Sequence, residues 1–393
     1  MDFEFTEEQK KLRQEIREFC LTEPEGELED SRITHYYSPE LFRKLVNRGW
    51  VGLSFPKEYG GQGLTAVEEV ILLEELAYAR KRVYITGIGS SVQFFGTLFL
   101  RFGSEELKKT YLPQIARGES WFSQSYTEPE AGSDLLAIQT RAVREGDYYI
   151  LNGQKMFSSS GHRRDHFPRQ YLVVMAVTDP DAPREKGLSL FVVDTTTPGM
   201  STDTLVTIAG WITNQLYIDS VRVPKENLVG EENRGWDYFM ASRHKYWDRM
   251  NGNYQGTLLR ALDDLTQYLK ENPSLNTPLA RQRIADMATR IEILRLLTYR
   301  MAWAEAEGLD VQNMASIARI FRDQALIDYP NVSMDILGLS GQLRATSKYA
   351  PMGGMAEYLY RNNVYYFFAG AGNLLMKNYI ASRGLGLPGG LAM

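Results

Sequence analysis

Residues 126–134 read YTEPEAGSD. A proline, an alanine and a glycine stand at the centre of this segment and do not suit the middle of a strand or helix, so we predict a shaped loop. Thr127 and Ser133 add hydroxyl groups, and the small residues would let a ligand approach the backbone. Backbone N–H groups in such a turn can hold an anionic or electron-rich group. An ordinary connecting loop without a ligand is the alternative, and the residues alone leave both interpretations open.

Short runs rich in β-branched and aromatic residues follow this loop. They read YYILNGQKMF (148–157), YLVVMAVTD (171–179), LSLFVVD (188–194) and QLYIDSVRVP (215–224). Turn-forming pairs such as Asn-Gly, Asp-Pro and Pro-Gly punctuate the region, and no long helical pattern interrupts it. The spacing predicts a small antiparallel sheet or barrel and disfavours a Rossmann sheet.

Helical patterns lie on both sides of the strand-rich region. Thr6 followed by Gln9 predicts a capping box at the start of a first helix, and Ser38-Pro39 predicts the start of a second. Periodic apolar residues return after Gly235. We therefore expect an α+β multidomain chain, with an N-terminal helical domain at 1–121, a small β-barrel or sandwich domain at 122–236, and a C-terminal helical domain at 237–393.

The bulk composition excludes several classes of protein. The chain has 393 residues, 44% hydrophobic content and a net charge of −5, which permits a sizeable core and gives no basic surplus for nucleic acid. Cys20 is the only cysteine, so neither an internal disulfide nor a cysteine-based metal site can form. His162 and His166 could be read as metal ligands, but a solvated polar loop is the favoured interpretation and no metal is expected.

The N-terminal segment carries carboxylates where a secretion signal would carry cations and an apolar run. No segment offers the ~18 uninterrupted apolar residues needed to span a membrane. We therefore expect a soluble, cytoplasmic protein in a reducing compartment, with no membrane partner.

A second element of interest reads NGQKMFSSSG, residues 152–161. Asn-Gly is a hairpin signal, and the strand that follows ends in an aromatic residue and three serines. Phe157 could lie against a flat ring while Ser159 donates a hydrogen bond to the edge of that ring. Packing of Phe157 into a barrel core is the alternative.

These residues resemble the acyl-CoA dehydrogenase family, in order and over essentially the whole chain. YTEPEAGSD is similar to the family's T-E-P-x-A-G-S-D loop, and GWVGLSFPKEYGGQG (49–63) is similar to its Y-G-G-x-G signature. LNGQKMFSSSG, KGLSLFVVD and DSVRVPKENLVGEENRGW complete the match. The resemblance implies a helical domain, a small β domain and a C-terminal four-helix bundle. It also implies FAD as cofactor, an acyl-CoA substrate and electron-transfer flavoprotein as electron acceptor.

In the family a base removes the proton alpha to the thioester, and the beta hydrogen leaves as hydride to flavin N5. Carried over residue by residue, the resemblance assigns the flavin to the 124–133 loop, with Phe157 in place of the usual tryptophan. It implies that Ser133 also contacts the substrate, and that Arg249 is the helix arginine near the CoA site. The cofactor-binding residues implied in this way are Gln124, Tyr126, Thr127, Gly132, Ser133, Phe157, Ser159, Arg281 and Gly372.

The chain departs from the family where the catalytic glutamate usually stands. That segment reads FFAGAGNLLMKNYIASR here, and the glutamate position falls on Gly370 or, in the other register, Ala369. No acid follows Glu357. Some relatives place the base just before the helix arginine, and Asp248 occupies that place. Asp248 is therefore the predicted base, with an ion pair or a capped loop as the alternative, and Gly370 would open room for the acyl group.

A second departure concerns the adenine end of the cofactor. The family's R-x-x-F-G-like loop is replaced by LKENPSLNTPLARQRIADM, which offers Arg281 and Arg283 instead. A partner subunit could supply the missing contact, because family members are usually dimers of dimers. The resemblance therefore implies a homo- or heterotetramer.

Three functions remain open from the sequence. The first is α,β-desaturation of a bulky, branched or cyclic acyl-CoA, which places the chain in lipid metabolism. The second is a non-catalytic or half-site subunit of a heteromeric complex. The third is altered flavin chemistry on an acyl-CoA.

Overall fold

The computed structural model describes residues 4–23, 38–80, 84–159, 167–210, 212–369 and 372–388, except for the side chains of 84–87 and 243–248. His35, His162, His166 and Gly370 lie outside the described residues, as do the side chains of His244 and Asp248. The chain forms two compact units. Unit 1 comprises Met1–Arg32, Thr65–Tyr84 and Trp247–Met393, and unit 2 comprises Ile33–Leu64 and Ile85–Tyr246.

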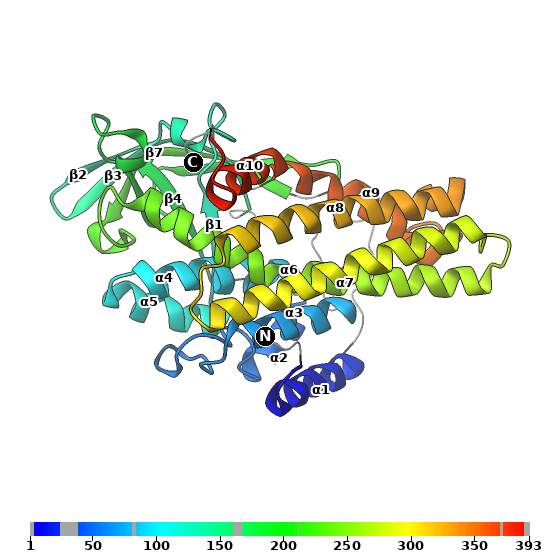
Figure 1. Cartoon of the computed structure of the whole chain (residues 1–393). Helices are drawn as coiled ribbons and strands as arrows, with labels where there is room; N and C mark the ends of the chain where they lie inside the picture. The colour runs from blue at the N-terminus through cyan, green and yellow to red at the C-terminus, as the bar shows by residue number, and fades with distance from the viewer. Residues whose placement is uncertain are drawn as a thin grey trace. The chain divides into compact units, whose positions relative to one another are not determined.

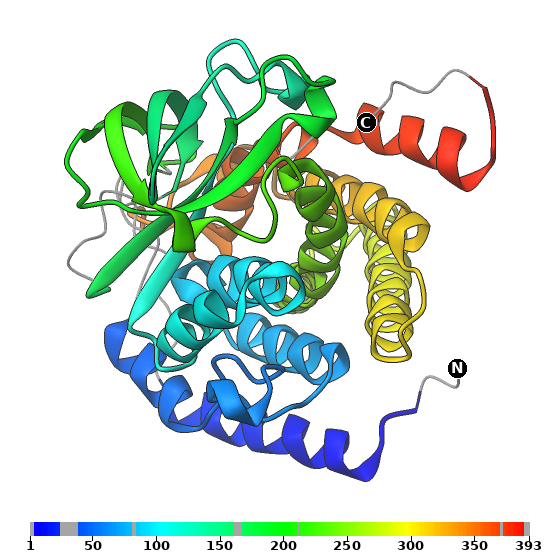
Figure 2. The same cartoon turned by 90° about the vertical axis from the view of Figure 1, so that its left-hand side faces the viewer.

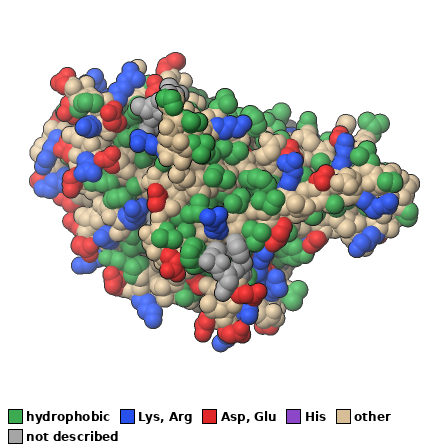
Figure 3. Space-filling model, viewed as in Figure 1, with side chains coloured by type: hydrophobic (Ala, Val, Ile, Leu, Met, Phe, Trp, Pro, Cys, Tyr) green, Lys and Arg blue, Asp and Glu red, His purple; other side chains and the backbone are tan. Residues whose placement is uncertain are grey.

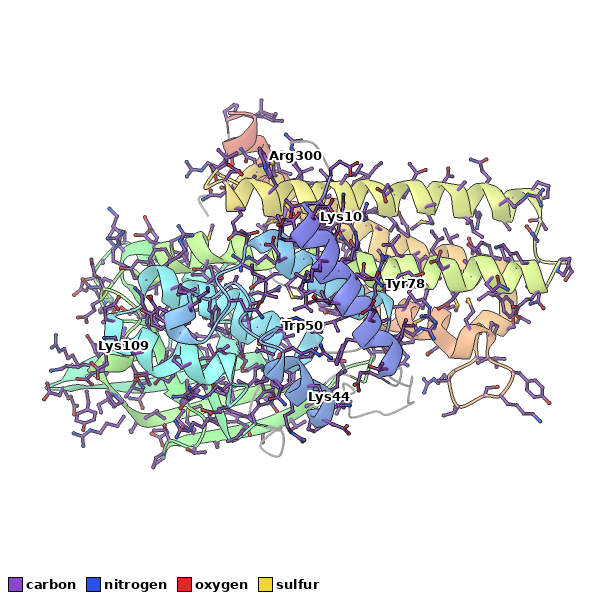
Figure 4. The ribbon with its side chains drawn as sticks, turned by 90° about the horizontal axis from the view of Figure 1, so that it is seen from below. Lys10, Lys44, Trp50, Tyr78, Lys109 and Arg300 are labelled. Atoms are coloured by element: carbon purple, nitrogen blue, oxygen red, sulfur yellow. The ribbon has the colours of Figure 1, made fainter. Side chains whose placement is uncertain are left out.

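The predicted helix starts are confirmed. Thr6 caps α1 (Glu7–Thr22) by accepting a hydrogen bond from the Gln9 backbone, and the Gln9 side chain bonds back to the Thr6 N–H at 3.1 Å. Ser38 caps α2 (Pro39–Asn47), whose first residue is a proline that needs no N–H partner there. In unit 1, α1 lies against α3 (Ala66–Tyr78); Lys10 marks α1 and Tyr78 the end of α3 in Figure 4.

In unit 2, helical segments precede the first strand of the sheet. They are the π-helical segment η2 (Tyr84–Gly96), α4 (Thr97–Phe102) and α5 (Glu105–Ala116). The sequence predicted a helical domain over this region but not the wider π turn. Most described side chains of η2 are buried, which explains why the apolar run shows no single solvent face.

Among the described residues of unit 2, seven strands form one central sheet, which is visible in Figures 1 and 2. The strands are β1 (Ser120–Ser125), β2 (Arg141–Glu145), β3 (Tyr148–Ser158), β4 (Arg169–Val177), β5 (Leu188–Asp194), β6 (Met200–Val206) and β7 (Ile212–Pro224). One apolar face forms the core through alternating residues such as Leu151, Leu172 and Phe191.

Two expectations about the sheet were wrong. The sheet is mixed, because β4 pairs in parallel with both β1 and β2, whereas the other pairings are antiparallel. Asn152-Gly153 makes no hairpin turn but lies within β3, where the register with β7 shifts. A Cβ on Gly153 would come within 2.3 Å of the Thr140 hydroxyl, so the glycine permits close passage of the strand past β2 rather than a chain reversal.

Helices return after the sheet. They are α6 (Gly235–Glu271), which begins in unit 2 and continues in unit 1, α7 (Pro278–Ala306), α8 (Gln312–Leu337), α9 (Met355–Asn363) and α10 (Asn373–Tyr379). In unit 1, α7 packs on α8, and α8 packs on α9 and α10. The predicted order of helical, strand-rich and helical regions is confirmed.

Candidate flavin and acyl-CoA site

The first strand of the sheet is fixed by hydroxyl groups from η2. The Ser91 hydroxyl accepts the Phe122 N–H at 2.9 Å, and the Ser90 hydroxyl donates to the Phe122 carbonyl at 2.7 Å. The Trp121 indole N–H donates to Ser90 at 3.0 Å. These bonds hold β1 in place, and therefore also the start of the loop at 126–134.

A buried ion pair then fixes the loop itself. Lys155 Nζ lies 2.8 Å from Glu128 Oε1 and donates to the Tyr126 carbonyl at 3.0 Å; the side-chain exposures of Lys155 and Glu128 are 0% and 8%. Glu128 also accepts the backbone N–H groups of Gln139 and Thr140, at 2.6 and 2.9 Å. A buried charge pair of this kind is costly unless its remaining hydrogen-bonding sites are filled, and here the backbone fills them.

The pKa values of the pair reflect burial and attraction together. Burial lowers the pKa of Lys155 to about 8, against the opposing pull of Glu128. Burial would raise the pKa of Glu128, but Lys155 and the hydrogen bonds outweigh it and lower that pKa. Both groups are therefore charged at neutral pH.

The structure brings the two sequence elements together. The Met156 N–H donates to the Thr127 carbonyl at 2.8 Å, and the Ser158 hydroxyl donates to the Gln124 carbonyl at 3.2 Å. The end of β3 therefore runs beside the loop, with Phe157 between these two contacts.

Phe157 is held in an unusual state. Its φ is +58°, and its side chain is 59% exposed. Left-handed backbone at a bulky residue costs about 1–3 kcal/mol and is often found at ligand sites. An exposed aromatic ring on a strained backbone fits a planar ligand that covers the ring.

The other predicted flavin residues offer a suitable surface around Phe157. Gln124, Gly132, Ser133 and Ser159 are exposed, Thr127 is half-buried and Tyr126 is buried. A Cβ on Gly132 would meet nothing within 4 Å, so the backbone there is open to a ligand. An aromatic face, nearby hydroxyls and accessible loop backbone together fit an isoalloxazine ring. The individual cofactor contacts stay predictions.

Arg249 lies in a buried charge cluster of unit 1. It stands on α6, and its guanidinium lies 2.7 Å from Glu69 Oε2 of α3 and 2.7 Å from Glu305 Oε1 of α7. Burial would lower its pKa, but the two carboxylates outweigh burial and raise it. Arg249 therefore ties three helices together one residue after Asp248. Its contact with acyl-CoA stays a prediction.

The segment that replaces the usual catalytic glutamate is also anchored in unit 1. The buried Arg319 of α8 donates to the Ala369 carbonyl at 2.6 Å. The nearest preceding acid in the sequence, Glu357, pairs with Arg361 at 2.7 Å. The described part of this segment has no carboxylate, its aromatic residues Phe367 and Phe368 are exposed, and the preceding acid Glu357 is engaged in an ion pair.

Arg281 and Gly372 also belong to unit 1. Arg281 is exposed in the first turn of α7 and donates to the Asn276 carbonyl at 3.0 Å. Gly372 caps the start of α10, where its carbonyl accepts the Leu375 N–H at 2.9 Å. Their cofactor roles stay predictions.

Sequence reasoning assigned no role to Glu128 and Lys155, the two residues that fix the loop. The signal was present, because each charged residue stands inside one of the two motifs singled out for flavin binding. Their separation of 27 positions concealed the pairing. The described residues contain no cluster of His, Cys, Asp or Glu suited to a metal ion, and no helix among them is long and apolar enough to cross a membrane.

Family models of the acyl-CoA dehydrogenase N-terminal, middle and C-terminal domains match residues 6–119, 123–221 and 233–385. The chain belongs to the acyl-CoA dehydrogenase family, whose members are FAD-dependent oxidoreductases acting on acyl-CoA.

One related sequence and two related structures are similar to the chain over nearly its whole length. "Acyl-CoA dehydrogenase FadE26" of Mycobacterium tuberculosis is 30% identical, with 99% of each chain covered. A structure titled "Tcur3481-Tcur3483 steroid ACAD" has a TM-score of 0.88 at 30% identity, covering 99% of this chain and 100% of that one. The "ChsE4-ChsE5 complex from Mycobacterium tuberculosis" has a TM-score of 0.83 at 28% identity, with coverage of 99% and 100%.

The exposed ring of Phe157 leads to a first prediction. Phe157→Gly should relieve the positive φ and leave the thermal stability of the apoprotein unchanged or higher. It should also weaken FAD binding about threefold to tenfold, because an aromatic contact contributes about 0.5–1.5 kcal/mol. Reconstitution of apoprotein with FAD, followed by flavin fluorescence, measures both quantities, and Phe157→Trp serves as the control that retains FAD. Unchanged FAD affinity in the glycine variant would contradict the assignment of Phe157 to the flavin site.

Proposed function

We propose that this chain desaturates the α,β bond of a bulky, branched or cyclic acyl-CoA, with Asp248 as the base. Electron-transfer flavoprotein would be the electron acceptor. The substrate size, the base, the acceptor and the assembly are all parts of this proposal.

The absence of a usable acid in the C-terminal segment carries the proposal. No acid follows Glu357 in the sequence, and Glu357 is bound to Arg361. The Ala369 carbonyl is held by Arg319, so this part of the segment is fixed by its backbone and contributes no titratable group. A dehydrogenase built on this chain therefore needs its base elsewhere, and Asp248 stands next to the anchored Arg249.

The proposed reaction assigns only a few chemical roles to residues of this chain. Loss of the alpha proton leaves enolate-like charge on the thioester, which hydrogen bonds to its oxygen stabilise. When bound, FAD supplies the acceptor for the beta hydride. Phe157 and the loop fixed by Glu128 and Lys155 orient the reacting face, and Asp248 holds the alpha proton on its carboxylate.

The substrate class has two sources of support. The sequence at 369–372 has small residues where the family usually has a glutamate, a replacement that would leave room for a larger acyl group. The structural relative titled a steroid acyl-CoA dehydrogenase covers the whole chain at 30% identity. Together they favour a cyclic acyl group over a straight one.

The second candidate function is a supporting subunit in a heteromeric complex. The relative named as the ChsE4-ChsE5 complex contains two different chains, which favours this candidate. In unit 1, apolar side chains of Ile293, Leu296 and Ile317 on α7 and α8 are 36–45% exposed, and such surface suits association into a homo- or heterotetramer.

An absorbance experiment on the purified full chain tests the proposal. We expect flavin absorbance that bleaches under anaerobic conditions when a cyclic acyl-CoA is added, and a tetramer in sedimentation. A chain that carries flavin but bleaches only after a second subunit is added would favour the half-site role. A chain that binds no flavin, alone or with a partner, would contradict the proposal.

A further inference from the structure

Three buried polar groups of unit 2 have no hydrogen-bond partner among the described residues and lie on elements that meet around one tyrosine. They are the Tyr126 hydroxyl, both amide atoms of Gln93 and the Ser242 hydroxyl. Gln93 and Ser242 are fully buried, and Tyr126 is 6% exposed. Leaving such a group unsatisfied costs about 1–3 kcal/mol, so native chains rarely do so without a reason.

The aromatic contacts of Tyr126 join these elements. The Tyr126 ring meets Phe239 of α6 edge to face at 5.2 Å between centroids, and Phe94 of η2 at 6.4 Å. Ser242 lies one helical turn after Phe239, on the same side of α6. Gln93 immediately precedes Phe94. The polar groups therefore stand on the same three elements as the rings.

Two further observations point to a ligand rather than to chance. The segment that carries Gln93 is π-helical, a rare conformation that is frequent at functional sites. Tyr126 immediately precedes Thr127, the residue expected at the flavin. Phenylalanine would fill the position of Tyr126 without the cost of a buried hydroxyl.

The unpartnered groups also share one chemistry. A tyrosine hydroxyl, a serine hydroxyl and a primary amide can each donate a hydrogen bond, and each can accept one. No described charge contacts the Tyr126 hydroxyl, and burial alone raises its pKa, so it remains a neutral donor at physiological pH. A neutral oxygen, in a hydroxyl or keto group, suits such a set better than a carboxylate or phosphate.

We propose that Tyr126, Gln93 and Ser242 form a polar subsite for a hydroxyl or keto oxygen on the acyl group. The subsite rests on the proposed function, because it takes the acyl-CoA as its ligand. It makes Tyr126 a specificity-determining residue, and it names the substrate class as oxygenated cyclic acyl-CoA. A carbonyl oxygen of the flavin offers the same chemistry, and the experiment below separates the two sources.

The test compares dissociation constants for cyclohexanecarbonyl-CoA and a ring-hydroxylated analogue on the FAD-loaded full chain. We expect wild type to bind the hydroxylated ligand at least about tenfold more tightly, since one satisfied buried group is equivalent to about 5- to 150-fold. Tyr126→Phe should reduce this ratio towards one. The same variant should unfold at a higher urea concentration as apoprotein, because an unsatisfied hydroxyl is gone.

Tyr299→Phe is the matched control. Tyr299 of unit 1 also has a buried hydroxyl without a partner, and burial raises its pKa to about 12. Its loss should raise the urea midpoint in the same way and leave the ligand ratio unchanged.

The outcomes separate the alternatives. An unchanged ligand ratio in Tyr126→Phe would overturn the subsite, and so would a failure of wild type to distinguish the two ligands. Loss of FAD affinity with an unchanged ratio would also overturn it and assign the hydroxyl to the flavin. These are binding measurements, so a chain that binds selectively but never bleaches would contradict the proposed function and support the subsite.

Discussion

Asp248→Asn should slow the reduction of bound flavin by acyl-CoA about 10²- to 10⁴-fold, the usual cost of losing a general base. The asparagine side chain has nearly the same size and cannot take the alpha proton. Because Arg249 holds this turn of α6 through Glu69 and Glu305, the helix should keep its place. FAD affinity and the dissociation constant of acyl-CoA should therefore stay close to those of wild type.

Anaerobic stopped-flow absorbance measures the reduction rate, and equilibrium titration measures the two affinities. Glu357→Gln is the matched control, because it makes the same carboxyl-to-amide change in the last acid of the chain. It should reduce the flavin at a normal rate, since Glu357 pairs with Arg361. Near-native reduction by Asp248→Asn would refute the assignment and leave a carboxylate of another chain, or the supporting-subunit role.

Lys155→Met should destabilise unit 2 by about 3–5 kcal/mol, the cost of removing one partner from a buried ion pair. The methionine fills similar space but leaves the Glu128 carboxylate buried without its cation. Among the described residues, only the backbone N–H groups of Gln139 and Thr140 still bind it. The loop at 126–134 should loosen, so FAD retention should fall together with stability.

Differential scanning calorimetry should show a fall in Tm on the order of 10 °C for this unit. Lys225→Met is the matched control, since Lys225 pairs with Asp147 in the same unit but both side chains are well exposed, and such pairs contribute about 0–1 kcal/mol. The double variant Glu128→Gln, Lys155→Met should recover part of the loss because no buried charge remains. Equal effects of Lys155→Met and Lys225→Met would contradict the importance of the buried pair.

On the face shown in Figure 3, basic and acidic side chains are interspersed with apolar ones, as expected from a net charge of −5. Unit 2 also has buried features of note, namely the ion pair between Glu128 and Lys155 and the polar groups around Tyr126.

The order of the helical and strand-rich regions could be predicted from the residues alone. The same holds for the starts of α1 and α2, because Thr6 with Gln9 and Ser38 with Pro39 act on the backbone within one turn. The family and its cofactor could be predicted because loop motifs such as YTEPEAGSD are contiguous. These signals involve residues that are close together in the sequence, so they can be recognised without the tertiary structure.

The pairings between distant residues could not be predicted from the sequence, because they depend on the folded chain. Asn152-Gly153 is a sequence typical of a hairpin turn. In the structure, however, Gly153 lies close to Thr140 at a crowded position within a strand. Glu128 meets Lys155 because β3 returns to the loop, and Arg249 meets Glu69 across 180 positions of chain. Burial gives these charges and the Tyr126 hydroxyl their energetic importance. The burial of each residue depends on which other parts of the chain pack around it.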